Sequence, residues 1–153
     1  MELALRIVHL MAAAVWVGGT IALVFVAVPP AQRLEGEARA RQLRELGRRW
    51  RPLGWSALGV AVITGIAIAA REHAYDGAPR DFDWVLAVKG LLVGLLVAGA
   101  YLHDYVLGPG FARQIREGAP QSRRAVLVAV GRTNLLLTIA IPVLGVVLSE
   151  LLD

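Results

Sequence analysis

The sequence predicts an all-α integral membrane protein, a four-helix bundle built from a single domain that covers residues 1–153. The mean hydropathy is +0.60, and 57% of the residues are hydrophobic while only 18% are charged. Four apolar segments are each long enough to cross a hydrocarbon core of about 30 Å at about 1.5 Å per helical residue. These segments and their loops use nearly the whole chain, so no separate soluble domain is expected.

The first two predicted spans are each bounded by proline. Span 1 runs from about Leu3 to Val28 and is expected to stop at Pro29-Pro30, because proline cannot continue a helix. Its apolar run is too long for a cleaved signal peptide, and further spans follow it. Span 2 runs from about Leu53 to Ala70, with Pro52 at its start. Both segments are therefore expected to be retained transmembrane helices.

The last two predicted spans have similar lengths. Span 3 runs from about Trp84 to Leu107 and is expected to end at Gly108-Pro109-Gly110. Span 4 runs from about Ala125 to Leu148, and Pro142 inside it predicts a kink. We see no convincing internal repeat in the sequence.

The distribution of arginine predicts the orientation of the spans. The loops after spans 1 and 3 are rich in arginine, whereas the loop after span 2 holds Arg71 and Arg80 against four acidic residues. The positive-inside rule therefore places both termini and the 71–83 loop on the periplasmic side of a bacterial inner (cytoplasmic) membrane, crossed several times. The stretch Ala31–Arg49 is expected to form an amphipathic helix on the cytoplasmic surface, facing anionic lipid, or else a solvated loop. Topology explains the net charge of +4, so nucleic acid is not an expected partner.

Ionisable residues within the spans form two predicted layers. Charged or titratable groups at membrane depth are costly and usually mark a site. His9 and Lys89 lie at similar depth from the outer face, and His73 lies at the outer end of span 2 or in the loop beyond it. His103 follows Lys89 by fourteen residues on the same helix face, about 21 Å further in. The inner layer is expected to hold four residues flanked by Tyr101 and Tyr105: His103, Asp104, Arg132 and Asn134.

These residue types suit haem. Histidine is a common axial ligand of haem iron, helix bundles place ligands on facing helices, and arginine suits the propionates. The candidate metal ligands are His9, His103 and His73, and no catalytic residue is assigned. Simpler roles are open for each: a hydrogen bond to a neighbouring helix for the histidines, snorkelling or an acidic partner for Lys89, an ion pair between Asp104 and Arg132, and core packing for Trp16. The candidate cofactor-binding residues are His9, Lys89, His103, Arg132, Asn134 and Trp16.

Three short motifs resemble a known group of membrane proteins. His9 followed by Trp16-Val17-Gly18-Gly19 resembles the first helix of the CopD-like copper-resistance proteins and of the related HemJ-type protoporphyrinogen oxidases. The stretch Trp84-Val85-Leu86-Ala87-Val88-Lys89-Gly90 resembles their third-helix lysine motif, and Arg132-Thr133-Asn134 resembles a segment of their last helix. The HemJ-type resemblance implies b-type haem with a helix-1 histidine and a helix-3 lysine as the important pair, here His9 and Lys89. The CopD-like resemblance implies copper handling at the periplasmic face.

The sequence therefore predicts a membrane-bound b-type haem protein with one or two haems. Its expected role is electron transfer, or the oxidation or scavenging of a small substrate, and a haem-dependent oxidoreductase is the enzymatic form of this hypothesis. The expected partners are the lipid bilayer, further copies of the chain, and a redox partner or quinone. The alternatives are a copper-binding or copper-transport protein that uses His9, His73 and outer-loop carboxylates, and a structural protein without a cofactor. The absence of cysteine and the presence of only two methionines exclude thiolate sites and a methionine-rich copper relay. His103-Asp104-Tyr105 has no counterpart in the HemJ pattern and would suit a second haem or metal site.

Overall fold

The computed structural model describes residues 2–72, 80–118, 120, 122 and 124–150, and every regular element in these ranges is a helix. This confirms the all-α class. Four helical segments are long and apolar enough to cross a membrane, judged by length and composition. They are Leu3–Gln32, Gly36–Arg71, Asp83–Arg116 and Arg124–Val147.

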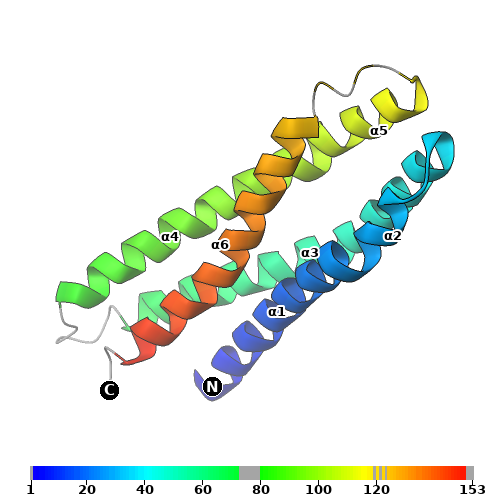
Figure 1. Ribbon diagram of the computed structural model, residues 1–153. Helices are drawn as coiled ribbons and strands as arrows, with labels where there is room; N and C mark the ends of the chain where they lie inside the picture. The colour runs from blue at the N-terminus through cyan, green and yellow to red at the C-terminus, as the bar shows by residue number, and fades with distance from the viewer. Residues whose placement is uncertain (1, 73–79, 119, 121, 123, 151–153) are drawn as a thin grey trace.

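The first two spans form a helical hairpin. Helix α1 (Glu2–Ala22) continues through a π-helical segment, η1 (Leu23–Ala27), into the short helix α2 (Val28–Gln32). The chain then reverses and returns along α1 as the long helix α3 (Gly36–Glu72) (Figure 1). Gly36 begins α3 with a φ of 48°, a conformation that glycine adopts without steric cost.

The last two spans form a second hairpin of the same design. Helix α4 (Arg80–Tyr101) passes through the π-helical segment η2 (Leu102–Leu107) into α5 (Gly108–Arg116), and α6 (Arg124–Glu150) returns along α4. Both hairpins run in the same direction, so the start of α1 and the end of α6 lie at the same end of the bundle (Figure 1).

The two hairpins are an internal structural repeat with a spacing of 80 residues. Pro109 lies 80 positions after Pro29, and each proline follows the end of a π-helical segment by two residues. The repeat lies in the order of the helical elements, where the sequence analysis saw no convincing repeat of residues. Only a few residue types recur in the two copies, which hides the relation in the sequence. Repeats that run in the same direction are related by an axis along the membrane normal.

The prolines do not end the helices where the sequence analysis expected. Proline lacks an N–H and its ring clashes with the carbonyl four residues earlier. The chain accommodates Pro29 and Pro109 with the wider π turns that precede them, and each proline then lies in the first turn of a new helix, where no N–H is needed. Spans 1 and 3 are consequently longer than predicted. Pro142 lies inside α6, as predicted.

Helix α3 also begins earlier than predicted. It starts at Gly36 and runs through Pro52 for 37 residues, about 56 Å at 1.5 Å per residue, nearly twice the thickness of a hydrocarbon core. The stretch Ala31–Arg49 is therefore not a separate surface helix, because most of it continues directly into the second span. The arginine-rich first half of α3 extends beyond the apolar half and packs against α5.

Two buried clusters hold the helices together. At mid-length, Trp16 of α1 lies 6.2 Å from the Trp50 ring of α3, between ring centroids, and its indole N–H donates to Thr138 Oγ1 of α6 at 3.2 Å. A Cβ at position 19 would overlap the Trp50 ring, so Gly19 is required for this packing. Towards the arginine-rich end, Ala40 packs against Phe111 and Ile115 of α5.

Candidate functional site

The outer layer contains His9, whose ring is oriented by α3. His9 Nδ1 lies 3.0 Å from Thr64 Oγ1, and the Thr64 hydroxyl lies 2.6 Å from the carbonyl oxygen of Val60. A hydroxyl has one hydrogen to donate, and the Val60 carbonyl accepts it. The Thr64 oxygen therefore accepts from His9 Nδ1–H, which assigns the Nδ1–H tautomer and leaves the lone pair on Nε2. This is the form in which a neutral imidazole binds a metal, with its second nitrogen held by a hydrogen bond.

A glycine makes room for the His9 ring. A Cβ at position 65 would lie 3.1 Å from His9 Cε1, closer than ordinary contacts. The Thr64 hydroxyl also lies 3.2 Å from the carbonyl oxygen of Ala61, so Ala61 and Thr64 lie on one turn of α3. The His9 ring thus contacts a single turn of the neighbouring helix α3 through its Nδ1 atom.

Lys89 occupies the equivalent position in the second hairpin. It lies 80 residues after His9 and is half-buried on α4, and Lys89 Nζ lies 3.3 Å from where a Cβ at position 145 would be. Gly145 is in turn the repeat counterpart of Gly65. The Lys89 ammonium interacts electrostatically with His9. The structure therefore brings His9 and Lys89 into one layer. Each side chain packs against a glycine of the helix that returns along its own, Gly65 for His9 and Gly145 for Lys89.

Trp16 lies in the buried core between the layers. Its indole N–H is satisfied by Thr138, which is only 1% exposed, and its ring packs against Trp50. These contacts join α1 to α3 and α6 and account for the burial of Trp16. This is the core-packing role that the sequence analysis named as the simpler alternative for Trp16.

The inner layer is organised by Asp104. Its Oδ1 lies 3.0 Å from His103 Nδ1, and its Oδ2 accepts a hydrogen bond from Trp55 Nε1 at 3.2 Å. Arg51 donates to the backbone carbonyl of Asp104, and its guanidinium lies 5.2 Å from the centre of the Tyr105 ring. His103 Nε2 faces α6, 3.5 Å from where a Cβ at Gly131 would be.

Sequence reasoning missed Arg51 and Trp55. Their spacing of four residues places both on one face of a helix, which is the signal that could have found them. The predicted boundary of span 2 at Pro52 separated the pair, because proline was taken as a helix start. The continuous helix α3 instead presents both residues to η2.

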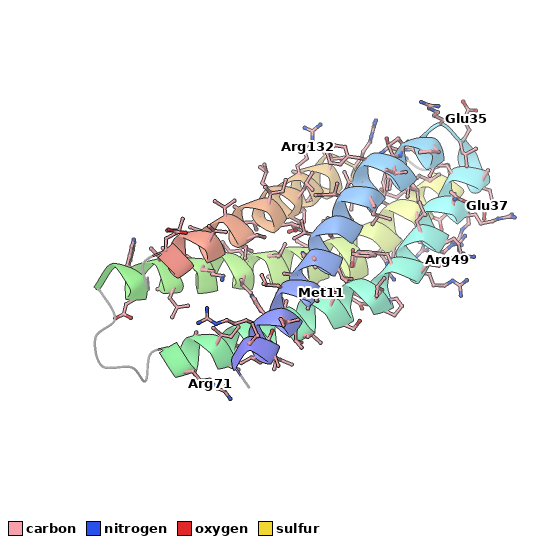
Figure 2. All side chains as sticks on the ribbon, turned by 90° about the horizontal axis from the view of Figure 1, so that it is seen from below. Met11, Glu35, Glu37, Arg49, Arg71 and Arg132 are labelled. Atoms are coloured by element: carbon pink, nitrogen blue, oxygen red, sulfur yellow. The ribbon has the colours of Figure 1, made fainter. Side chains whose placement is uncertain are left out.

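Arg132 does not join the inner layer. It is exposed, and its side chain points away from the bundle (Figure 2). Asn134, two residues later, faces α4, where a Cβ at Gly99 would overlap Asn134 Oδ1. Residues two apart on a helix are separated by about 200°, so Arg132 and Asn134 cannot both face inward. Within the described ranges the carboxylate of Asp104 contacts His103 and Trp55, in place of the Arg132 ion pair that was one of the alternatives.

The candidate metal ligands do not cluster within the described residues. No group of three His, Cys, Asp or Glu side chains in these ranges could hold a metal ion. His73 lies outside the described residues, as does part of the outer loop that the copper hypothesis needs.

No family model, curated protein or solved structure matches this chain.

Proposed function

We propose that this protein is a membrane-bound b-type haem protein with a redox role, and that His9 is an axial ligand of the iron. The observation that carries the proposal is the hydrogen bond between His9 and Thr64. Because the Thr64 hydroxyl gives its hydrogen to Val60, His9 Nε2 retains the lone pair that a metal needs. A neutral histidine fixed in this tautomer is what haem proteins use as a proximal ligand.

The repeat supports Lys89 as the second functional residue of the same site. In the proposed site His9 would hold the iron, and a second residue from the other hairpin would complete the site. His9 and Lys89 occupy equivalent positions on two hairpins of the same design. In the proposed site, Lys89 either ligates the iron as a neutral amine or pairs as an ammonium with a haem propionate. The HemJ-type resemblance points to the same two residues.

The haem supplies the electron-transfer or oxidation chemistry, while the chain binds and orients it. We propose that the protein lies in a bacterial inner membrane with its arginine-rich end on the cytoplasmic side, forms oligomers and exchanges electrons with a redox partner or quinone. The His9 layer then lies in the periplasmic half of the membrane. The copper hypothesis depends on His73 and outer-loop carboxylates, and no observation among the described residues favours it.

Absorption spectroscopy tests the proposal directly. The protein purified in detergent from haem-replete cells is expected to show a Soret band that sharpens and shifts on reduction. Replacing His9 with Ala is expected to remove this signal or alter it strongly. The matched control is His103→Ala, which removes the other described histidine and is expected to leave the outer-site signal in place. A colourless protein that also fails to take up added hemin would contradict the proposal.

A further inference from the structure

A hollow lies at the arginine-rich end, between the two hairpins. Its volume is about 570 Å³, within the usual range for small-molecule sites. It is bordered by η1 and α2 of the first hairpin, by the first half of α3, and by η2, α5 and the start of α6. Among its lining residues Asp104 is the single carboxylate, whereas six are arginines: Arg39, Arg44, Arg51, Arg113, Arg116 and Arg124. We call this hollow the arginine groove.

The positive charge of the arginine groove is incompletely neutralised by the described residues. Asp104 already contacts His103 and Trp55 through its two carboxylate oxygens. Arg44 lies 3.5 Å from Glu37, and Arg113 lies 2.8 Å from Glu117. The other four arginines contact no carboxylate within the described part of the chain. The groove therefore favours an anionic ligand.

Two of these arginines also have unmet hydrogen bonds. The Nε atoms of Arg39 and Arg51 are buried and have no acceptor among the described residues. The Arg39 guanidinium lies 5.9 Å from the centre of the Phe111 ring, and that of Arg51 lies over Tyr105, so aromatic rings hold both groups in place. A buried donor without an acceptor carries a free-energy cost. A ligand with several acceptor oxygens would remove that cost, and phosphate oxygens match the fork of donors on arginine.

Much of the remaining lining of the arginine groove is apolar. Leu23 and Val28 line it from the first hairpin, and Leu127 and Val128 line it from α6. Val28, Leu127 and Val128 lie close to the ends of the candidate membrane spans. A ligand that fits has an anionic head and an apolar body. A free phosphate shares the first property but would leave the apolar lining uncovered.

We propose that the arginine groove binds one acidic phospholipid, with its phosphate among Arg39, Arg51, Arg116 and Arg124 and its acyl chains against the apolar lining. This is a bound lipid held between two hairpins, in contrast to a general attraction of the arginine-rich surface to anionic membranes. It is independent of the haem site proposed at His9, because His9 and Lys89 do not line the groove.

Native mass spectrometry of the detergent-solubilised full chain tests the proposal by giving an apparent Kd for the first bound lipid. Phosphatidylglycerol is expected to bind at least tenfold more tightly than phosphatidylcholine with the same chains. The variant carrying Arg116→Gln and Arg124→Gln is expected to bind phosphatidylglycerol about tenfold more weakly, because it removes two of the four guanidinium groups proposed to contact the phosphate. Both side chains are exposed and have no carboxylate contact among the described residues, so the fold should be retained, as circular dichroism would verify.

The matched control carries Arg33→Gln and Arg41→Gln. These arginines are exposed at the same end but do not line the groove, and the change in net charge is identical. The control is expected to shift the Kd less than threefold. Equal losses in both double variants would overturn the proposal in favour of nonspecific surface charge. Equal binding of the two lipids, or displacement of phosphatidylglycerol by inorganic phosphate at comparable affinity, would overturn it as well.

Discussion

The hydrogen bond between Thr64 and His9 allows the haem proposal to be tested as a change in hemin affinity. Thr64→Val keeps the shape of the side chain and removes only the hydroxyl. His9 Nδ1–H then loses the acceptor at 3.0 Å, and the ring loses a restraint on its tautomer and rotation. Loss of such a partner from a metal-binding histidine typically lowers metal affinity 10–100-fold. This corresponds to about 1.4–2.8 kcal/mol, similar to the cost of one unsatisfied buried donor.

Titration of hemin into the haem-free protein in detergent, followed at the Soret band, measures this effect as a change in Kd. Thr64→Ser keeps the hydroxyl and is expected to bind hemin within about threefold of the unchanged protein. The matched control is Thr138→Val, which removes the same group from the acceptor of Trp16. It is expected to lower thermal stability while shifting the hemin Kd less than threefold. Unchanged hemin binding in Thr64→Val, or an equal loss in Thr138→Val, would refute the role assigned to Thr64.

Three further outcomes are expected. Lys89→Met should lower the haem content or shift the reduction potential measured by redox titration, because the Lys89 amino group beside Gly145 in the outer layer is lost. A haem content and a potential equal to those of the unchanged protein would favour a purely structural role for Lys89. For His103, the number of haem molecules per chain decides between one and two sites. A ratio near two that falls to one in His103→Ala supports a second cofactor. A ratio near one in both proteins leaves His103 as the hydrogen-bond partner of Asp104. Gly19→Ala should destabilise the fold by about 1–3 kcal/mol in thermal unfolding, because the new methyl group overlaps Trp50. Gly18→Ala, which meets no atom within 4 Å, should not, and equal stability of the two variants would contradict the packing described here.

Several errors of the sequence analysis have one origin, the treatment of proline as a helix boundary. Pro29, Pro52 and Pro109 were each expected to bound a span, and the chain passes through all three as helix. The cost of a proline is local, and packing between long helices compensates it, with π turns providing the relief at two positions. Once the boundary at Pro52 was assumed, Arg51 was placed in a loop, and its contact with η2 could not be anticipated.

The error at Arg132 has a different cause. Counting residues from the end of a span gives depth, because each residue advances a helix by about 1.5 Å. It gives no direction around the axis unless one residue of the helix is already placed. Arg132 and Asn134 have nearly the same depth and point to different sides, and only the packing of α6 on α4 decides which of them faces Gly99.

The sequence by itself determined that the protein is helical and has four segments able to cross a membrane. Lipid demands about 20 consecutive apolar residues with an internally bonded backbone, and this requirement can be read along the chain. It also identified His9 and Lys89 as residues of similar depth, since depth follows from counting. Only the tertiary structure decided that Thr64 orients His9, that Arg51 and Trp55 meet η2, and that the two hairpins form a repeat enclosing the arginine groove. Those relations depend on the rotation of each helix about its axis and on which helices pack together, and both are set by contacts between residues far apart in the chain.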